Sequence, residues 1–169
     1  MLILQKINII KYNINMLDIE DFKKKFDKKS RLMGIDPGKK RIGIAICDEN
    51  KIIATPYTTI IKNDYSKFLN EIKQIIEENQ IKGIVIGNPI NMDGSPSQSS
   101  QSAKDLARNL SKDITENITM WDERLSSQGA FNLSGNLDIN TSKKVKKLDE
   151  NAAQFILQGA IDYFTKEKT

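Results

Sequence analysis

Apolar residues in the first part of the chain cluster in a way that predicts a β-hairpin. The alternating run 42–46 is rich in isoleucine and predicts one strand, and the segment before Asp36 predicts its hairpin partner. The turn between them contains Pro37 and Gly38. A third strand is predicted over 51–56, where a proline should end it.

From residue 66 onward, helical spacing alternates with continuous apolar runs of the kind found in parallel strands that are covered on both faces. The helical segments are 66–79, 99–110 and a last helix that opens at Asp149, and the apolar runs are 83–87 and 118–123. The order β-β-β-α-β-α-β-α predicts an α/β domain with a mixed central sheet of about five strands flanked by helices.

Residues 1–31 are predicted to form an N-terminal extension, poorly defined by the pattern, in front of a domain that spans 32–169. Leu17, Phe22 and Phe26 have helical spacing, which favours a helix that docks loosely and caps the sheet. Lysine and asparagine interrupt the first apolar run, so it is too polar for a secretory signal or a membrane span. We expect no association with a membrane.

Composition restricts the chemistry more than the overall charge does. The chain has 38% hydrophobic and 28% charged residues, and its net charge of +4 arises within the extension, because the remainder is balanced. The absence of histidine excludes His-based acid–base catalysis and leaves carboxylates, lysine, tyrosine or a metal for any hydrolysis. The one cysteine, Cys47, lies in an apolar strand and predicts a buried thiol in a reducing, cytoplasmic location.

Acidic residues occur at three positions where apolar surroundings make a carboxylate costly unless it has partners. Asp36 ends the first strand, Asp122 and Glu123 end the last one, and Asp149 shares helical spacing with the apolar residues that follow it. Ligands of open α/β sheets bind beyond the carboxyl ends of the strands, where the strand acids should lie. The alternatives are turn chemistry for Asp36 and helix capping for Asp149.

A polar segment over 88–101 follows the strand predicted at 83–87 and is rich in glycine, proline and serine. It is longer than the usual connection of about 4–6 residues, which favours a substrate loop. We expect it to be mobile without substrate and to close over the substrate when it is bound.

Four motifs, in order, resemble those of the YqgF-type family. They are 34–38 with 41–45, 86–94, 121–127, and 147–153 with 156–158. Members of this family are known as Holliday junction resolvases and as pre-16S rRNA nucleases. The resemblance covers roughly residues 32–165 and implies an RNase H-like fold and a hydrolase that acts on ester bonds.

The resemblance also implies a site. In the family, an aspartate of the first strand, the acid of an Asp-Glu-Arg motif and an aspartate of the last helix act together, and they match Asp36, Glu123 and Asp149. Such a cluster suits Mg²⁺ or Mn²⁺, which reverses the repulsion between carboxylates and activates a water molecule. Strand alternation points Asp122 and Glu123 to opposite faces, so only one of them can easily join Asp36. The family pattern favours Glu123, and Asp122 is the alternative ligand.

Cations beside these acids are expected to hold nucleic acid through its phosphates. They are Lys39, Lys40, Arg41, Arg124, Lys143 and Lys144. The favoured function is metal-dependent cleavage at the 5′ end of pre-16S rRNA by a monomer or homodimer. The alternatives are a resolvase-like endonuclease that acts on branched DNA and a nucleic-acid-associated factor without catalytic activity.

Overall fold

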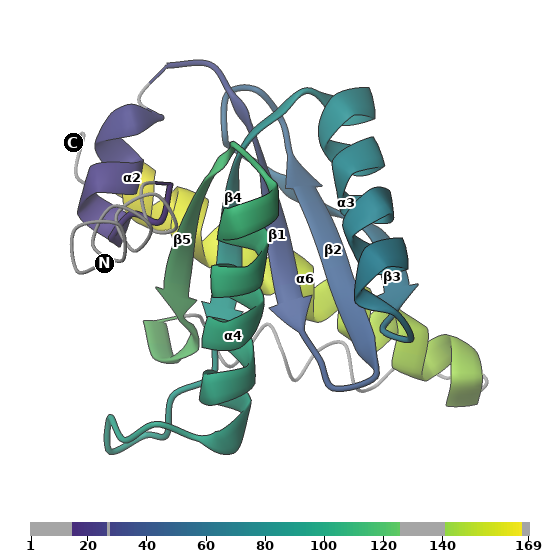
Figure 1. Ribbon diagram of the computed structural model, residues 1–169. Coiled ribbons are helices and arrows are strands. Elements are labelled where there is room, and N and C mark those ends of the chain that lie inside the picture. The colour runs from purple at the N-terminus through teal and green to yellow at the C-terminus, as the bar shows by residue number, and fades with distance from the viewer. Residues whose placement is uncertain (1–14, 27, 126–140, 167–169) are drawn as a thin grey trace, which may run out of the picture.

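The computed structural model of the chain describes residues 15–26, 28–125 and 141–166, with the backbone alone for 141–150. Figure 1 shows a twisted sheet between two layers of helices. The elements in chain order are α2 (Ile19–Lys25), β1 (Arg31–Pro37), β2 (Arg41–Cys47), β3 (Ala54–Ile61), α3 (Tyr65–Asn79), β4 (Ile81–Asn88), α4 (Gln98–Asp113), β5 (Asn117–Asp122), the short 3₁₀ helix η1 (Glu123–Leu125) and α6 (Thr141–Lys166).

The five strands form one sheet in the order β3-β2-β1-β4-β5. β1 is its central strand, antiparallel to β2 and parallel to β4, while β3 and β5 form the two edges. Crossover helices connect β3 to β4 and β4 to β5, so the carboxyl ends of β1, β4 and β5 lie at one end of the molecule (Figure 1). These features confirm the predicted α/β, RNase H-like arrangement with a mixed five-stranded sheet.

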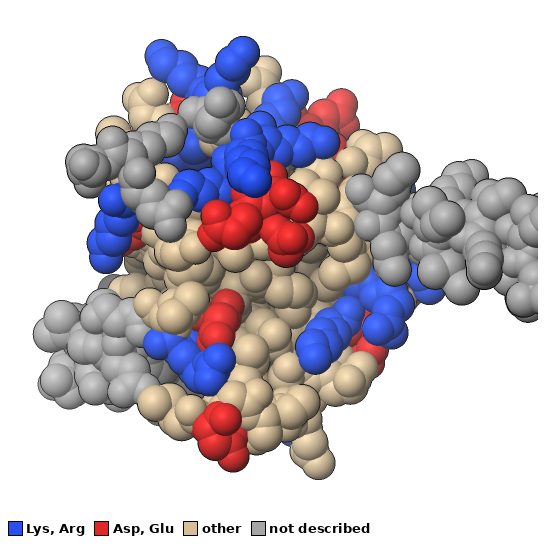
Figure 2. Space-filling view, turned by 90° about the vertical axis from the view of Figure 1, so that its left-hand side faces the viewer, with Lys and Arg blue, Asp and Glu red and all other residues tan. Residues whose placement is uncertain are grey.

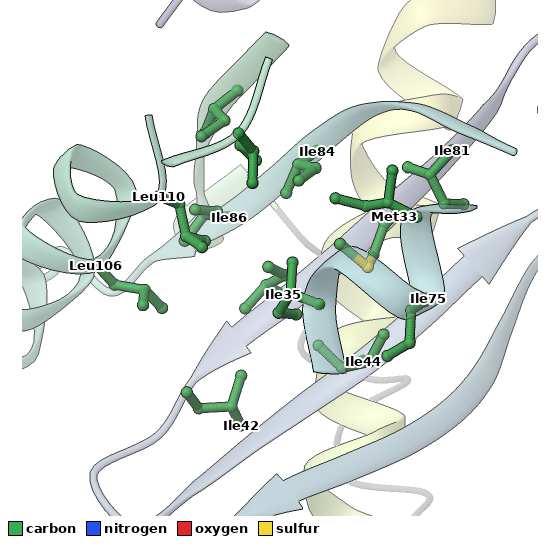
Figure 3. Close-up of a cluster of buried hydrophobic side chains, with 14 of the residues drawn as sticks. Met33, Ile35, Ile42, Ile44, Ile75, Ile81, Ile84, Ile86, Leu106 and Leu110 are labelled. Atoms are coloured by element: carbon green, nitrogen blue, oxygen red, sulfur yellow. The ribbon is translucent and has the colours of Figure 1, made fainter. Parts of the chain in front are cut away.

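Two apolar cores lie on the two faces of the sheet. One joins the sheet to α3 and α4, and Figure 3 shows its side chains converging from strands and helices. Its fully buried members include Met33, Ile35, Ile42, Ile44, Ile72, Ile84, Ile86 and Leu110. The second core joins the opposite face to α6 and α2. Because consecutive residues of a strand point to opposite faces, each strand contributes to both cores.

Two predicted boundaries are wrong. β3 continues through Pro56 to Ile61 instead of ending at the proline. An edge strand tolerates a proline because one side of its backbone makes no ladder hydrogen bonds, and the register with β2 shifts between Ile44 and Ala45, beside this position. α6 begins at Thr141, eight residues before Asp149, so Asp149 is not the residue that caps it.

The described part of the N-terminal extension packs closely on the sheet, not loosely as predicted. Phe22 is fully buried and Phe26 nearly so, and a Cβ added at Gly83 would lie 2.7 Å from the Phe26 ring. The side chain of Asn15 also donates hydrogen bonds to carbonyl groups that precede β5. The domain boundary at residue 31 remains a proposal, and on the side of the sheet that carries α2 the extension completes the core.

None of the helices in the described ranges is both long and apolar enough to cross a lipid bilayer. Cys47 is buried in β2, as its apolar surroundings predicted, and burial raises the pKa of its thiol.

Candidate active site

Asp36 lies near the carboxyl end of the central strand, on the face of the sheet that α6 covers. Two residues earlier on the same face, Gly34 is so close to α6 that an added Cβ would lie 2.6 Å from Leu157 Cβ. Strand alternation therefore directs Asp36 to the α6 side. Across the hairpin its partner is Gly43, which presents no side chain, and Asp36 itself is half-buried.

Glu123 reaches the same face from the far edge of the sheet. It is the first residue of η1, directly after β5, and its Oε1 atom would lie 2.5 Å from a Cβ added at Gly87 of β4. The side chain of Ile156 on α6 would be equally close to that Cβ, at 2.5 Å. The carboxylate of Glu123 thus lies over β4, beneath α6.

The strand register brings the two acids to one end of this face. Ile35 pairs with Ile86, so Asp36 and Gly87 are the next positions on neighbouring parallel strands, which lie about 4.8 Å apart. Glu123 lies over Gly87. The structure therefore places two of the three predicted ligands at the same end of the same face of the sheet, although they are 87 residues apart in the chain.

Burial raises the pKa of Glu123, and the nearby charge of Asp122 adds to the effect. A carboxylate that is partly withdrawn from water in this way gains stability from a bound cation, which favours its charged form. Oxygen ligands from carboxylates are those that Mg²⁺ and Mn²⁺ prefer. The donor atoms at this position therefore fit such an ion.

Asp122, the alternative ligand, pairs with Arg124 instead. Its carboxylate accepts hydrogen bonds from Nε of Arg124 at 3.0 Å and from Nη2 at 2.7 Å. This pairing with Arg124 outweighs the desolvation of Asp122 and lowers its pKa. Of the two neighbouring acids, Glu123 is the one whose carboxylate lies under α6.

The third predicted ligand, Asp149, is placed only through its backbone. It lies in α6 one turn before Ala153, whose carbonyl oxygen would be 3.0 Å from a Cβ added at Gly34. The side chains of Asp149, Lys143 and Lys144 fall outside the described residues. Within the described ranges, no three acidic or cysteine side chains are grouped as a metal site would require.

The segment predicted as a substrate loop is shorter than expected, because α4 begins at Gln98 after its N-cap residue Ser97. A turn closes its tip, where the N–H of Gly94 donates to the carbonyl of Asn91 at 2.8 Å and Gly94 has φ of 87°. A Cβ added at Gly94 would lie 3.4 Å from Nη1 of Arg124, so the tip lies beside the Asp122–Arg124 pair. Its mobility remains a prediction.

The predicted cationic residues differ in exposure. Lys39 and Lys40 are exposed in the β1–β2 turn, Arg124 is bound by Asp122, and Arg41 is partly buried. Figure 2 shows that on the side of α2 and β5, lysines and arginines gather at the upper end, by α2, rather than where the strands end. Most of the Lys and Arg side chains visible on this side therefore lie away from the candidate site.

Gly87 is the site residue that sequence reasoning missed. The signal was a glycine inside an otherwise apolar strand, which often marks the close approach of another group. Here the approaching groups are the Glu123 carboxylate and Ile156.

We expect Gly87→Ala to displace Glu123 and to lower the rate of cleavage at least about ten-fold. This is the usual effect of losing a residue that supports a metal ligand. The added methyl group would also overpack the α6 interface, which typically costs about 1–3 kcal/mol. Activity and urea unfolding of Gly87→Ala and of Gly87→Ala/Ile156→Val separate the two effects. Ile156→Val removes Cδ1, which the new methyl group would otherwise meet, but leaves the contact with Glu123. Full recovery of activity in the double variant would therefore show that displacement of Glu123 does not matter.

Comparison with known proteins places the chain in a family. The model of the family described as RuvX, Holliday junction resolvase, matches residues 30–163. A protein of Pelagibacter ubique (strain HTCC1062) named "Putative pre-16S rRNA nuclease" is 56% identical over 148 residues, which cover 88% of this chain and 98% of that protein. A protein of the same name from Novosphingobium aromaticivorans is 44% identical over 131 residues, which cover 78% of this chain and 84% of its own length.

Among solved structures, RuvC of T. thermophilus in complex with a Holliday junction substrate is similar, with 9% sequence identity and a TM-score of 0.49. The match covers 81% of this chain and 96% of that one. The family model matches most of the chain, and the two relatives named above match along 98% and 84% of their own length. The chain belongs to the RuvX Holliday junction resolvase family.

Proposed function

We propose that this protein is a metal-dependent nuclease that hydrolyses phosphodiester bonds and processes the 5′ end of pre-16S rRNA. The observation that carries the proposal is the position of Glu123 over Gly87, on the same face and at the same end of the sheet as Asp36. The names of the relatives support a nuclease of pre-16S rRNA.

Asp36, Glu123 and Asp149 are the proposed catalytic residues and would hold Mg²⁺ or Mn²⁺ between β1, η1 and α6. A bound ion of this kind supplies a Lewis acid for the phosphate and a water molecule activated for attack. The protein's own part is to hold carboxylates that would otherwise repel each other, and to bury Glu123 enough that its charge gains from a cation. This chemistry requires no histidine, in agreement with the composition.

Nucleic acid is the proposed partner. Exposed Lys39 and Lys40 continue from the end of β1, where a strand bound over Asp36 would pass, and cations there would neutralise its phosphates. Cleavage of a branched DNA is the second candidate, and the description of the family favours it. A cytoplasmic location is also proposed, supported by the buried free thiol of Cys47.

A cleavage assay with matched substrates tests this function. A pre-16S rRNA fragment with its 5′ extension and a four-way DNA junction would each be incubated with Mg²⁺, Mn²⁺ or EDTA. We expect cleavage of the RNA at the mature 5′ end with either ion and none with EDTA. Cleavage of the junction alone would favour the second candidate, and no cleavage of either substrate would contradict a nuclease.

A further inference from the structure

Arg41 lies on the same face of the sheet as Asp36, just beyond the end of β1. It is the first residue of β2, two positions before Gly43, which pairs with Asp36 across the hairpin. Residues two apart on a strand share a face, so Arg41 also faces α6. Diagonal neighbours of this kind have Cβ atoms about 7–8 Å apart, and Gly43 places no side chain between them.

The guanidinium group of Arg41 is partly buried, and one of its hydrogen-bond donors lacks an acceptor in the described part of the chain. Its Nη1 atom is buried and has no hydrogen-bond partner within the described part of the chain. A buried donor without a partner is unfavourable, and more so when it carries charge. Such a group persists where another function requires it, for example where a ligand supplies the missing acceptor.

The other arginine at this end of the sheet differs in this respect. Arg124 donates hydrogen bonds from Nε and Nη2 to the carboxylate of Asp122, so its charge is already compensated within the protein. Lys39 and Lys40 are exposed and hydrated, and they lie in the turn rather than under α6. Arg41 alone among these four cations combines a buried, unsatisfied donor with a position on the face of Asp36.

We propose that Arg41 binds a phosphate group of the nucleic-acid strand next to Asp36 and so positions the bond to be cleaved. This inference rests on the proposed nuclease function and names the group that orients its substrate. A guanidinium fits the task because its planar fork can donate two parallel hydrogen bonds to phosphate oxygens, which an ammonium cannot. Phosphate binding would also give Nη1 the acceptor that it lacks.

The test compares Arg41→Met and Arg41→Lys with the matched control Arg108→Met. Arg108 is exposed on α4 and pairs with Asp105, away from the candidate site. We expect Arg41→Met to lower kcat for pre-16S rRNA cleavage by about 10²–10³, the usual effect of removing a donor to developing negative charge. Arg41→Lys should recover only part of this loss, and Arg108→Met should leave kcat and KM unchanged.

Thermal unfolding distinguishes this role from a structural one. Removing an unsatisfied buried cation should leave the metal-free melting temperature of Arg41→Met unchanged or higher. Arg41→Met with kcat within three-fold of the wild-type value would overturn the inference while leaving the nuclease function intact. A drop in kcat that only follows a loss of folded protein would overturn it as well.

If the wild-type protein cleaves neither substrate, the nuclease proposal fails, and the role of Arg41 in phosphate binding is tested by RNA affinity instead. RNA affinity would then be measured by fluorescence anisotropy in EDTA over a range of salt concentrations. Loss of one phosphate contact should reduce the salt slope of Arg41→Met by about one, with Arg108→Met unchanged. Equal slopes for Arg41→Met and the wild type would overturn the inference.

Discussion

Replacing Asp36 with asparagine is expected to abolish cleavage while the protein remains folded. Losing a residue that merely supports a metal ligand typically costs about 10–100-fold, and losing a ligand itself should cost at least the upper end of this range. Removing one charge from a group of repelling carboxylates should leave the metal-free protein as stable as before, or more so. Cleavage in Mg²⁺ and thermal unfolding in EDTA, on the same preparation, measure both effects.

Asp162→Asn is a matched control for this prediction, because Asp162 is exposed on α6 and its carboxylate accepts a hydrogen bond from Gln158, one turn earlier in the same helix. It should cleave at the wild-type rate. An acid that served only as a buried partner would behave differently, since breaking such a pair typically costs about 3–5 kcal/mol. A less stable Asp36→Asn with undiminished Mg²⁺-dependent cleavage would therefore make Asp36 a structural residue.

Gly34→Ala is expected to cause a large loss of stability, because the added methyl group would meet the helix that covers the site. The new Cβ would lie 2.6 Å from Leu157 Cβ and 3.0 Å from the carbonyl oxygen of Ala153. Both atoms belong to or adjoin the backbone of α6, so a rotamer change cannot relieve the contact and the helix must shift. We expect a loss at the upper end of the usual range for overpacking, about 3 kcal/mol.

Urea unfolding measures this loss, and Gly159→Ala is its control. Gly159 lies within α6 and has no positive φ, so alanine there should be neutral or stabilising by up to about 1 kcal/mol through helix propensity. Because α6 also carries Asp149, Gly34→Ala should cleave more slowly even where it remains folded. An unchanged urea midpoint for Gly34→Ala would show that α6 does not pack against β1 as described.

The fold could be predicted from the sequence wherever a single periodic pattern decided the structure. The hairpin of β1 and β2, the helix α3 and the buried strands β4 and β5 followed from such patterns. The errors came where the position of a segment in the fold, rather than its own pattern, decided the structure. β3 passes Pro56 because it is an edge strand, and α6 starts before Asp149 although the lysine-rich segment there shows no apolar spacing.

The candidate site was predictable only in part, for a related physical reason. Alternation along the strands and the family motifs indicated Asp36 and Glu123, and the register brings them to one end of the sheet. The space that Gly87 leaves for Glu123 and the pairing of Asp122 with Arg124 depend on contacts between separate elements. No local pattern contains those contacts, so the sequence favoured Glu123 over Asp122 through the family motif alone, without a physical reason.

The most direct test of a shared metal site is calorimetric titration of Mn²⁺ into the wild-type protein and into Asp36→Asn, Glu123→Gln and Asp149→Asn. We expect saturable binding to the wild type and at least about ten-fold weaker binding to each of the three variants. Asp162→Asn should bind as the wild type does. Equal Mn²⁺ affinity in the wild type and all three variants would contradict a metal site formed by Asp36, Glu123 and Asp149.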